Sequence, residues 1–73
     1  MSADREYEKL LATIARNIKK YRTLRGMTQE QMADHGFNYR FYQKLESGKY
    51  SPNLRTLSRI SKFFKIRLVD LLT

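Results

Sequence analysis

Cysteine is absent from this chain of 73 residues, which excludes a disulfide framework and a thiolate metal site. The single histidine, His35, cannot hold a metal ion alone, so we expect no metal and no cofactor. No apolar run approaches the roughly 18 residues of a membrane-spanning helix, and the charged N-terminus lacks the apolar block of a signal peptide. We therefore expect a cytoplasmic protein that neither spans nor binds a membrane.

The residue patterns of an enzyme are also missing. The seven acids are scattered, no nucleophile forms a recognisable motif with His35, and there is no glycine-rich phosphate loop. We predict no enzymatic activity, and we place His35 in an exposed turn rather than at a ligand or a pH-sensing site. A domain of this size buries only about 60% of its unfolded surface, so we expect no pocket for a small-molecule effector.

Acids are scarce relative to bases. Asp plus Glu number 7 and Lys plus Arg number 15, which gives a formal net charge of +8. Five bases without an intervening acid lie in one stretch, namely Arg16, Lys19, Lys20, Arg22 and Arg25. A small basic domain attracts polyanions, most often nucleic acid or an anionic membrane. A solvated helix face would show the same charge, so composition alone does not decide between nucleic-acid binding and a solvated surface.

Glycine and proline are few, and they divide the chain into helices. No segment alternates in the manner of a strand, so we predict an all-α domain. Gly26, Gly36 and Gly48 each end a helix, and Pro52 lies near the first turn of a fourth. The predicted helices cover about residues 4–25, 28–35, 39–47, 52–64 and 68–72.

Capping residues and apolar spacing support these helices. We predict that Asp4 and Asn38 are N-caps and that Thr28 and Gln31 form a capping box. Side chains at spacings of three and four give the helices their inward faces. The predicted inward residues are Tyr7, Leu10, Leu11, Ile14, Ile18, Tyr21 and Leu24 in the first helix, Met32 and Ala33 in the second, and Leu54, Leu57, Ile60 and Phe64 in the fourth.

The stretch from Thr28 to Lys49 has the pattern of a helix-turn-helix, in which the second helix lies in the DNA major groove. The chain resembles the Cro/CI-type repressor domains, also called the XRE family of bacterial and phage regulators. The resemblance covers residues 13–73 and implies a five-helix lambda-repressor-like DNA-binding domain, with residues 1–12 as an extension of the first helix. The matching residues are Ile18, Arg22, 25–30, 32–33, 36–38, Tyr42, 45–48, Pro52, Leu54, 56–57, Ile60 and 66–72.

Besides this extension of the first helix, the chain departs from the family in three further features. The stretch from Ala33 to Gly36 is one residue shorter than is usual, and the third helix is more aromatic. Arg67 stands where family members often have a serine that caps the fifth helix.

Four outward side chains of the third helix are the predicted DNA base contacts: Tyr39, Arg40, Gln43 and Lys44. Arg40 can form a bidentate pair with guanine, and Gln43 with adenine. Tyr39 can touch a thymine methyl with its ring or a phosphate with its hydroxyl. Ordinary solvated side chains are the simpler alternative.

Aromatic side chains anchor this helix in our interpretation. We predict that Phe37, Tyr42 and Leu45 point into the core. Phe41 is ambiguous, because it can fill the groove between the second and third helices or lie exposed against DNA or a partner subunit. Aromatic residues at helical spacing favour the packing role.

Phosphate contacts are expected from helix N-termini and the adjoining loops. Gln29 begins the second helix, where free backbone N–H groups favour an anion, and the resemblance implies that this glutamine clamps a phosphate. A capping role alone is the alternative. The other predicted phosphate contacts are Arg22, Asn38, Lys49, Tyr50, Ser51 and Asn53. The resemblance also implies that Arg22 and Glu46 form an ion pair that orients the third helix.

Subunit pairing follows from the size of the reading helix. One helix reads only a few base pairs, so such domains bind as dimers to inverted half-sites. We predict a homodimer whose interface comes from the C-terminal region, with the added N-terminal turns as the other source. The predicted interface residues are Phe63, Ile66, Leu68, Val69 and Leu72.

These observations predict a sequence-specific regulator of transcription, acting as a repressor on a palindromic double-stranded DNA operator. One alternative is a protein-interaction or coactivator module that keeps the fold, and another is an antitoxin that represses its own operon. RNA binding and membrane-surface binding are weaker, the latter because the apolar stripe of the first helix is needed for the core.

Overall fold

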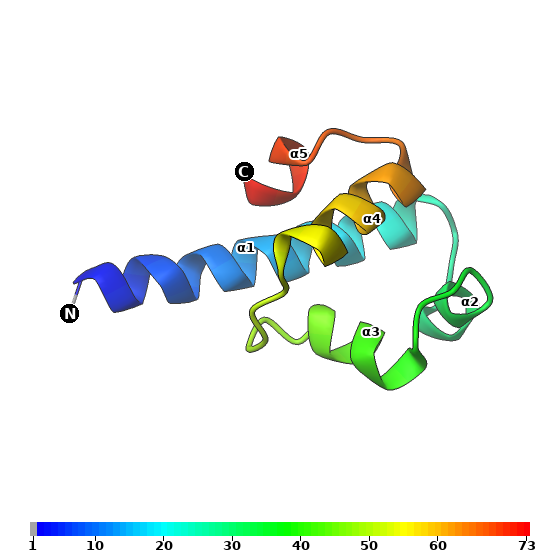
Figure 1. Cartoon of the computed structure of the whole chain (residues 1–73), viewed down its shortest axis with the longest axis horizontal. Helices are drawn as coiled ribbons and strands as arrows, with labels where there is room; N and C mark the ends of the chain where they lie inside the picture. The colour runs from blue at the N-terminus through cyan, green and yellow to red at the C-terminus, as the bar shows by residue number, and fades with distance from the viewer. Residues whose placement is uncertain (1) are drawn as a thin grey trace.

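The computed structural model describes residues 2–73, with side chains from Asp4 onward. Five helices follow one another as α1 (Ser2–Leu24), α2 (Gln29–Ala33), α3 (Tyr39–Leu45), α4 (Leu54–Phe64) and α5 (Val69–Leu72), and no strand occurs within the described residues. Figure 1 shows α1 as a long spine, with α5 on one side of it and α3 on the other. The predicted all-α fold of five helices is confirmed.

α1 begins earlier than the sequence pattern predicts. It starts at Ser2, so Asp4 lies in its first turn and is not the N-cap. There the carboxylate still interacts favourably with the positive end of the helix dipole. The helix ends at Leu24, and Gly26 follows with a φ of 65°, the left-handed conformation that glycine adopts at little cost.

α2 is short and has the predicted capping box. The Thr28 hydroxyl oxygen accepts from the Gln31 backbone N–H at 3.1 Å, and the Thr28 N–H donates to Gln31 Oε1 at 2.8 Å. The helix ends at Ala33, before the predicted stop at Gly36. The chain then runs through tight i to i+3 turns, in which the Gly36 N–H donates to the Ala33 carbonyl at 3.2 Å.

Asparagine caps begin the next two long helices. Asn38 Oδ1 accepts from the Phe41 N–H at 3.0 Å, which confirms the predicted cap of α3. This helix ends at Leu45, two residues short of the prediction. Asn53 Oδ1 accepts from the Thr56 N–H at 2.8 Å and caps α4. Pro52 therefore precedes the cap and lies outside the helix, which corrects its predicted place in the first turn.

The core lies where α1 meets the other helices. Its buried residues are Ile14, Ile18, Met32, Phe37, Tyr42, Leu45, Leu57, Ile60, Phe64 and Leu71. The Asn17 amide donates to the Leu71 carbonyl at 3.0 Å in this interior and fixes α5 on α1.

Five residues predicted to point inward are exposed instead, and three of them end or begin a helix. Ala33 is exposed at the end of α2, and Leu24 and Leu54 are 68% and 71% exposed. Each lies at a helix end, where apolar spacing still fits the stripe but no neighbouring element covers it. At the other end of α1, Tyr7 and Leu10 are also exposed, because the helix continues past the body of the domain.

Candidate nucleic-acid interface

α3 is held by one face and presents the other to solvent. Tyr42 and Leu45 are fully buried, and the Phe37 ring packs edge-on against Tyr42 with centroids 6.1 Å apart. Phe41 is half-buried and packs edge-on against the Tyr50 ring at 5.5 Å. Phe41 therefore packs, as favoured, but against the loop after α3 rather than between α2 and α3.

Arg22 and Glu46 connect α1 to the end of α3 in the interior. Arg22 Nε donates to Glu46 Oε2 at 2.7 Å and Nη2 donates to Oε1 at 3.0 Å, while Nη1 donates to the Met27 carbonyl at 2.7 Å. Both side chains are nearly buried, with 11% and 4% exposed. A bidentate pair of this kind fixes orientation as well as supplying energy.

The charge of Glu46 is stabilised by its partners. Burial raises the pKa of this carboxyl, but hydrogen bonds, led by that from Arg22, outweigh it and hold the pKa below its usual range. Glu46 is therefore ionised at neutral pH. Its effect on Arg22 is reciprocal, because the hydrogen bond to Glu46 raises the pKa of the guanidinium.

A chain of hydrogen bonds runs from this pair to the outer face of α3. Gln29 Nε2 donates to Glu46 Oε1 at 3.1 Å, and Gln43 Nε2 lies 3.4 Å from Gln29 Oε1 and 3.0 Å from the Tyr39 hydroxyl. The Tyr39 hydroxyl in turn donates to Glu30 Oε1 at 3.2 Å. Three predicted DNA contacts, Gln29, Tyr39 and Gln43, are thus brought together and held before any ligand arrives.

Glu30 is a member of this network that sequence reasoning missed. Partial desolvation and the Glu30 carboxylate raise the pKa of Tyr39, so its hydroxyl remains a donor. A phosphate contact from this hydroxyl would have to break its bond to Glu30. Only the crossing of α2 over α3 brings these side chains together, since nine positions separate them in the chain.

The other two predicted base contacts stand apart. Arg40 and Lys44 are exposed, and neither side chain has a hydrogen-bond partner among the residues that the structure describes. They leave α3 on the side that faces away from Tyr42 and Leu45.

Comparison with known proteins agrees with this geometry. Residues 18–71 match the helix-turn-helix family. An uncharacterized HTH-type transcriptional regulator of Methanocaldococcus jannaschii is 36% identical over 55 residues, which cover 74% of this chain and 83% of that protein. The chain belongs to the XRE-type helix-turn-helix family. It is a transcriptional regulator with a helix-turn-helix DNA-binding domain.

Two more relatives are also named as HTH-type regulators of transcription. An uncharacterized HTH-type transcriptional regulator of Archaeoglobus fulgidus is 40% identical over 55 residues, which cover 74% of this chain and 79% of that protein. The HTH-type transcriptional activator BcrR of Enterococcus faecalis is 40% identical over 57 residues, which cover 77% of this chain but 28% of BcrR. No solved structure matches the chain significantly.

The phosphate candidates of this XRE-type domain differ in their surroundings. Lys49 and Ser51 are exposed in the loop after α3, and Tyr50 is half-buried against Phe41. Asn38 and Asn53 are exposed, and each uses its Oδ1 as a helix cap. Arg22 differs from the rest.

The buried position of Arg22 favours one of its two predicted roles. The residue is 9% exposed, and Nε, Nη1 and Nη2 all donate inside the protein. This geometry supports the ion pair more than a direct phosphate contact.

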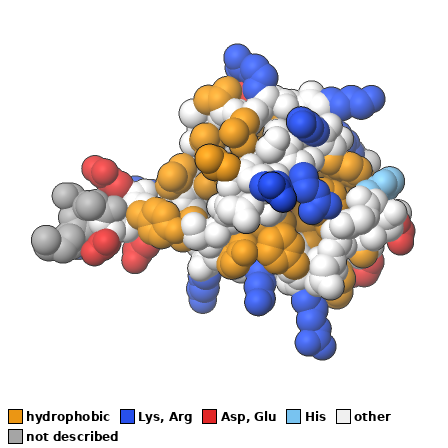
Figure 2. Space-filling model, viewed as in Figure 1, with side chains coloured by type: hydrophobic (Ala, Val, Ile, Leu, Met, Phe, Trp, Pro, Cys, Tyr) orange, Lys and Arg blue, Asp and Glu red, His pale blue; other side chains and the backbone are white. Residues whose placement is uncertain are grey.

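Two further arginines, which are not among the predicted site residues, have structural roles. Arg25 donates to the Phe64 carbonyl at the end of α4, and its guanidinium lies 5.1 Å from the Phe64 ring centroid. Arg59 lies 4.9 Å from the Phe37 ring centroid and donates to the Gly36 carbonyl at 3.3 Å, so it connects α4 to the turn of the helix-turn-helix. Figure 2 shows lysine and arginine side chains spread around the body of the domain on the face in view.

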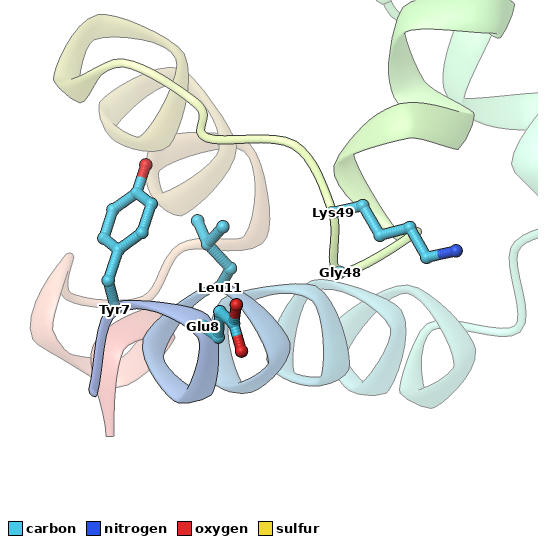
Figure 3. A pocket seen from close by; sticks show the side chains of 5 residues that line it. All are labelled: Tyr7, Glu8, Leu11, Gly48 and Lys49. Atoms are coloured by element: carbon cyan, nitrogen blue, oxygen red, sulfur yellow. The ribbon is translucent and has the colours of Figure 1, made fainter. Parts of the chain in front are cut away.

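A depression away from the outer face of α3 is lined by Tyr7, Glu8, Leu11, Gly48 and Lys49. Figure 3 shows Tyr7 and Leu11 rising from α1 into it, while the Lys49 side chain points away.

None of the helices within residues 2–73 is long and apolar enough to cross a membrane.

Proposed function

We propose that the protein is a cytoplasmic repressor that binds a specific double-stranded DNA sequence as a homodimer on inverted half-sites. The observation that carries this proposal is the outer face of α3. Arg40, Gln43 and Lys44 are exposed there, on a helix whose other face is buried. A protein-interaction module would not need basic and amide side chains on this face, so we favour DNA.

Base reading falls to the outer face. Arg40 can donate two of its guanidinium N–H groups to guanine O6 and N7, and Gln43 can pair with adenine N6 and N7. Both N–H groups of the Gln43 amide already donate, one to Gln29 and one to the Tyr39 hydroxyl, so pairing with adenine requires one of these bonds to be exchanged for a bond to N7. Lys44 and the Tyr39 ring complete the proposed base contacts.

Phosphate contacts fix the register of α3 in the groove. We assign them to Gln29 at the start of α2 and to the residues around α3 and its following loop. The latter are Asn38, Lys49, Tyr50, Ser51 and Asn53. Neutral contacts leave the salt dependence unchanged, so a log–log slope near −7 is expected only with roughly four phosphates in each subunit neutralised by lysine and arginine side chains.

The predicted interface residues near the C-terminus differ in how much of each side chain is exposed. Val69 is 44% exposed, whereas Phe63, Ile66, Leu68 and Leu72 are partly buried against the core. Val69 and the outer parts of the others form the proposed C-terminal share of the dimer interface. Half-sites about one helical turn apart suit such a dimer.

Repression follows when the operator overlaps the promoter, because the bound dimer then excludes the polymerase. BcrR is named an activator, so the sign of regulation is tested separately. A reporter with the selected operator placed over or upstream of the promoter decides it. Repression from the overlapping site is expected, and an increase from the upstream site alone would indicate an activator.

Selection from random duplex DNA tests the proposed function. We expect an enriched palindrome bound by two copies of the chain, and Arg40→Ala should relax the preference at one position in each half-site. Weak binding without any enriched motif would reject sequence-specific recognition and favour a protein partner instead.

A further inference from the structure

α1 continues well beyond the body of the domain. Residues 4–10, here called the α1 overhang, are all exposed, and Figure 1 shows them projecting past the other helices. A helix of 23 residues spans about 34 Å, whereas the short axes of the domain measure 24 and 21 Å.

The α1 overhang has an apolar side. Tyr7 and Leu10 are 49% and 39% exposed, and with Leu11 and Ile14 they follow the i, i+3, i+4, i+7 spacing of the stripe that enters the core. Figure 2 shows hydrophobic side chains where α1 leaves the body and over the neighbouring α5, which exposes Val69. The apolar stripe of α1 is therefore longer than the core that covers it.

Charge distinguishes the α1 overhang from the rest of the chain. Residues 4–9 hold three acids and two bases, a net charge of −1 in a chain of net charge +8. The opposite sign lies on residues 62–67, here called the α4–α5 segment, whose three bases are exposed. Arg67 is paired with Asp70 at 3.4 Å, so the docking argument uses the other two bases. The acids are Asp4, Glu6 and Glu8, and the bases are Lys62, Lys65 and Arg67.

The α5 helix of the same copy does not cover the α1 overhang. The hydrogen bond of 3.0 Å from the Asn17 amide to the Leu71 carbonyl holds α5 on the middle of α1. Leu10 lies two turns before Asn17, which is about 10 Å along the helix. The acidic and apolar side of the overhang therefore remains open next to the chain's own α5.

We infer that the α1 overhang is the docking site for the α4–α5 segment and α5 of a second copy. Tyr7 and Leu10 would cover the exposed Val69 of the second copy, and the acids around them would face its Lys62 and Lys65. A two-fold axis makes the contact reciprocal, since each copy supplies one overhang and one basic segment. This inference rests on the proposed homodimer and adds the N-terminal half of its interface.

Sedimentation velocity of the full chain without DNA tests the interface. We expect a dimer for the native sequence and self-association weakened on the order of tenfold or more for Leu10→Glu. Leu24→Glu is the matched control, because Leu24 is also an exposed leucine on α1, at the far end. Equal behaviour of the two variants, or a native chain that stays monomeric up to about 1 mM, would overturn the inference.

Charge reversal tests which surfaces meet. The pair Glu6→Lys and Glu8→Lys should weaken the dimer, and combining it with Lys62→Glu and Lys65→Glu should restore it. Melting followed by circular dichroism checks that each variant is folded. Failure of the combined variant to recover would reject the stated pairing.

DNA selection separates this inference from the proposed function. An enriched palindrome together with an unaltered Leu10→Glu dimer would leave the regulator standing and remove the interface. Loss of the dimer in Leu10→Glu without any enriched motif from the native chain would support the interface and reject the regulator.

Discussion

Polar side chains on the inner and the outer side of α3 have opposite surroundings. On the inner side, Glu46 is almost buried and is bound by Arg22 and Gln29. On the outer side, Arg40 and Lys44 are exposed and have no hydrogen-bond partner within the described chain. The inner polar groups therefore contribute to stability as well as orientation, whereas the outer ones are available to a ligand.

The largest effect is expected on the inner side. Glu46→Ala leaves the Arg22 guanidinium nearly buried without its anion, and we expect a loss of about 2–4 kcal/mol in the free energy of unfolding. DNA affinity should fall with it, because α3 loses its attachment to α1. Thermal melting and fluorescence anisotropy measure the two quantities.

Glu30→Ala is the matched control for that prediction. It also removes an acid, but an exposed one. The free energy of unfolding should therefore change by no more than about 0.5 kcal/mol, and the melting temperature by a correspondingly small amount. If Glu46→Ala were as harmless as Glu30→Ala, the ion pair would have no structural role.

Acid should destabilise the folded protein by protonating Glu46. The pKa of Glu46 is lowered in the folded protein, so the unfolded chain binds more protons as the pH falls. The stabilisation is present above the unfolded pKa of about 4.3 and is lost as the pH falls through the folded pKa. Urea titrations from pH 7 to pH 3 should show this loss, and the loss should be smaller in Glu46→Gln.

Changes on the outer face should leave stability intact. Arg40→Ala is expected to lower affinity for the selected operator by about 1–3 kcal/mol, because a bidentate pair to guanine is lost. Its melting temperature should match that of the native chain. A large drop in melting temperature would show that Arg40 belongs to the packing of α3 instead.

Removing the charge of Glu30 should raise DNA affinity, by less than Arg40→Ala lowers it. This carboxylate lies 3.2 Å from the Tyr39 hydroxyl, so its charge would repel the phosphates of DNA bound at the outer face of α3. Glu30→Gln keeps an acceptor for Tyr39 and removes the charge, so affinity for every duplex should rise about threefold. Anisotropy titrations with operator and random duplexes measure it, and a rise confined to the operator would indicate a direct base contact.

Local signals in the sequence predicted most of the fold. Thr28 and Asn38 cap helices as their residue types require, because a cap depends only on neighbouring backbone groups. The same spacing rules failed at Leu24 and Leu54, because periodicity identifies the side of a helix that is apolar but not how far the neighbouring elements extend.

The candidate site was predictable in its residues but not in its connections. The outward positions of Arg40, Gln43 and Lys44 follow from the helical period and the buried position of Tyr42. The contact between Tyr39 and Glu30 does not, because it depends on the angle at which α2 crosses α3. No local rule gives the value of that angle.

The most direct test of the account measures Arg40→Ala and Gln29→Ala against operators that carry each base in turn at every position. We predict that Arg40→Ala relaxes one position in each half-site, whereas Gln29→Ala weakens binding to all sequences alike. Uniform weakening by both substitutions would contradict the assignment of base reading to the outer face of α3.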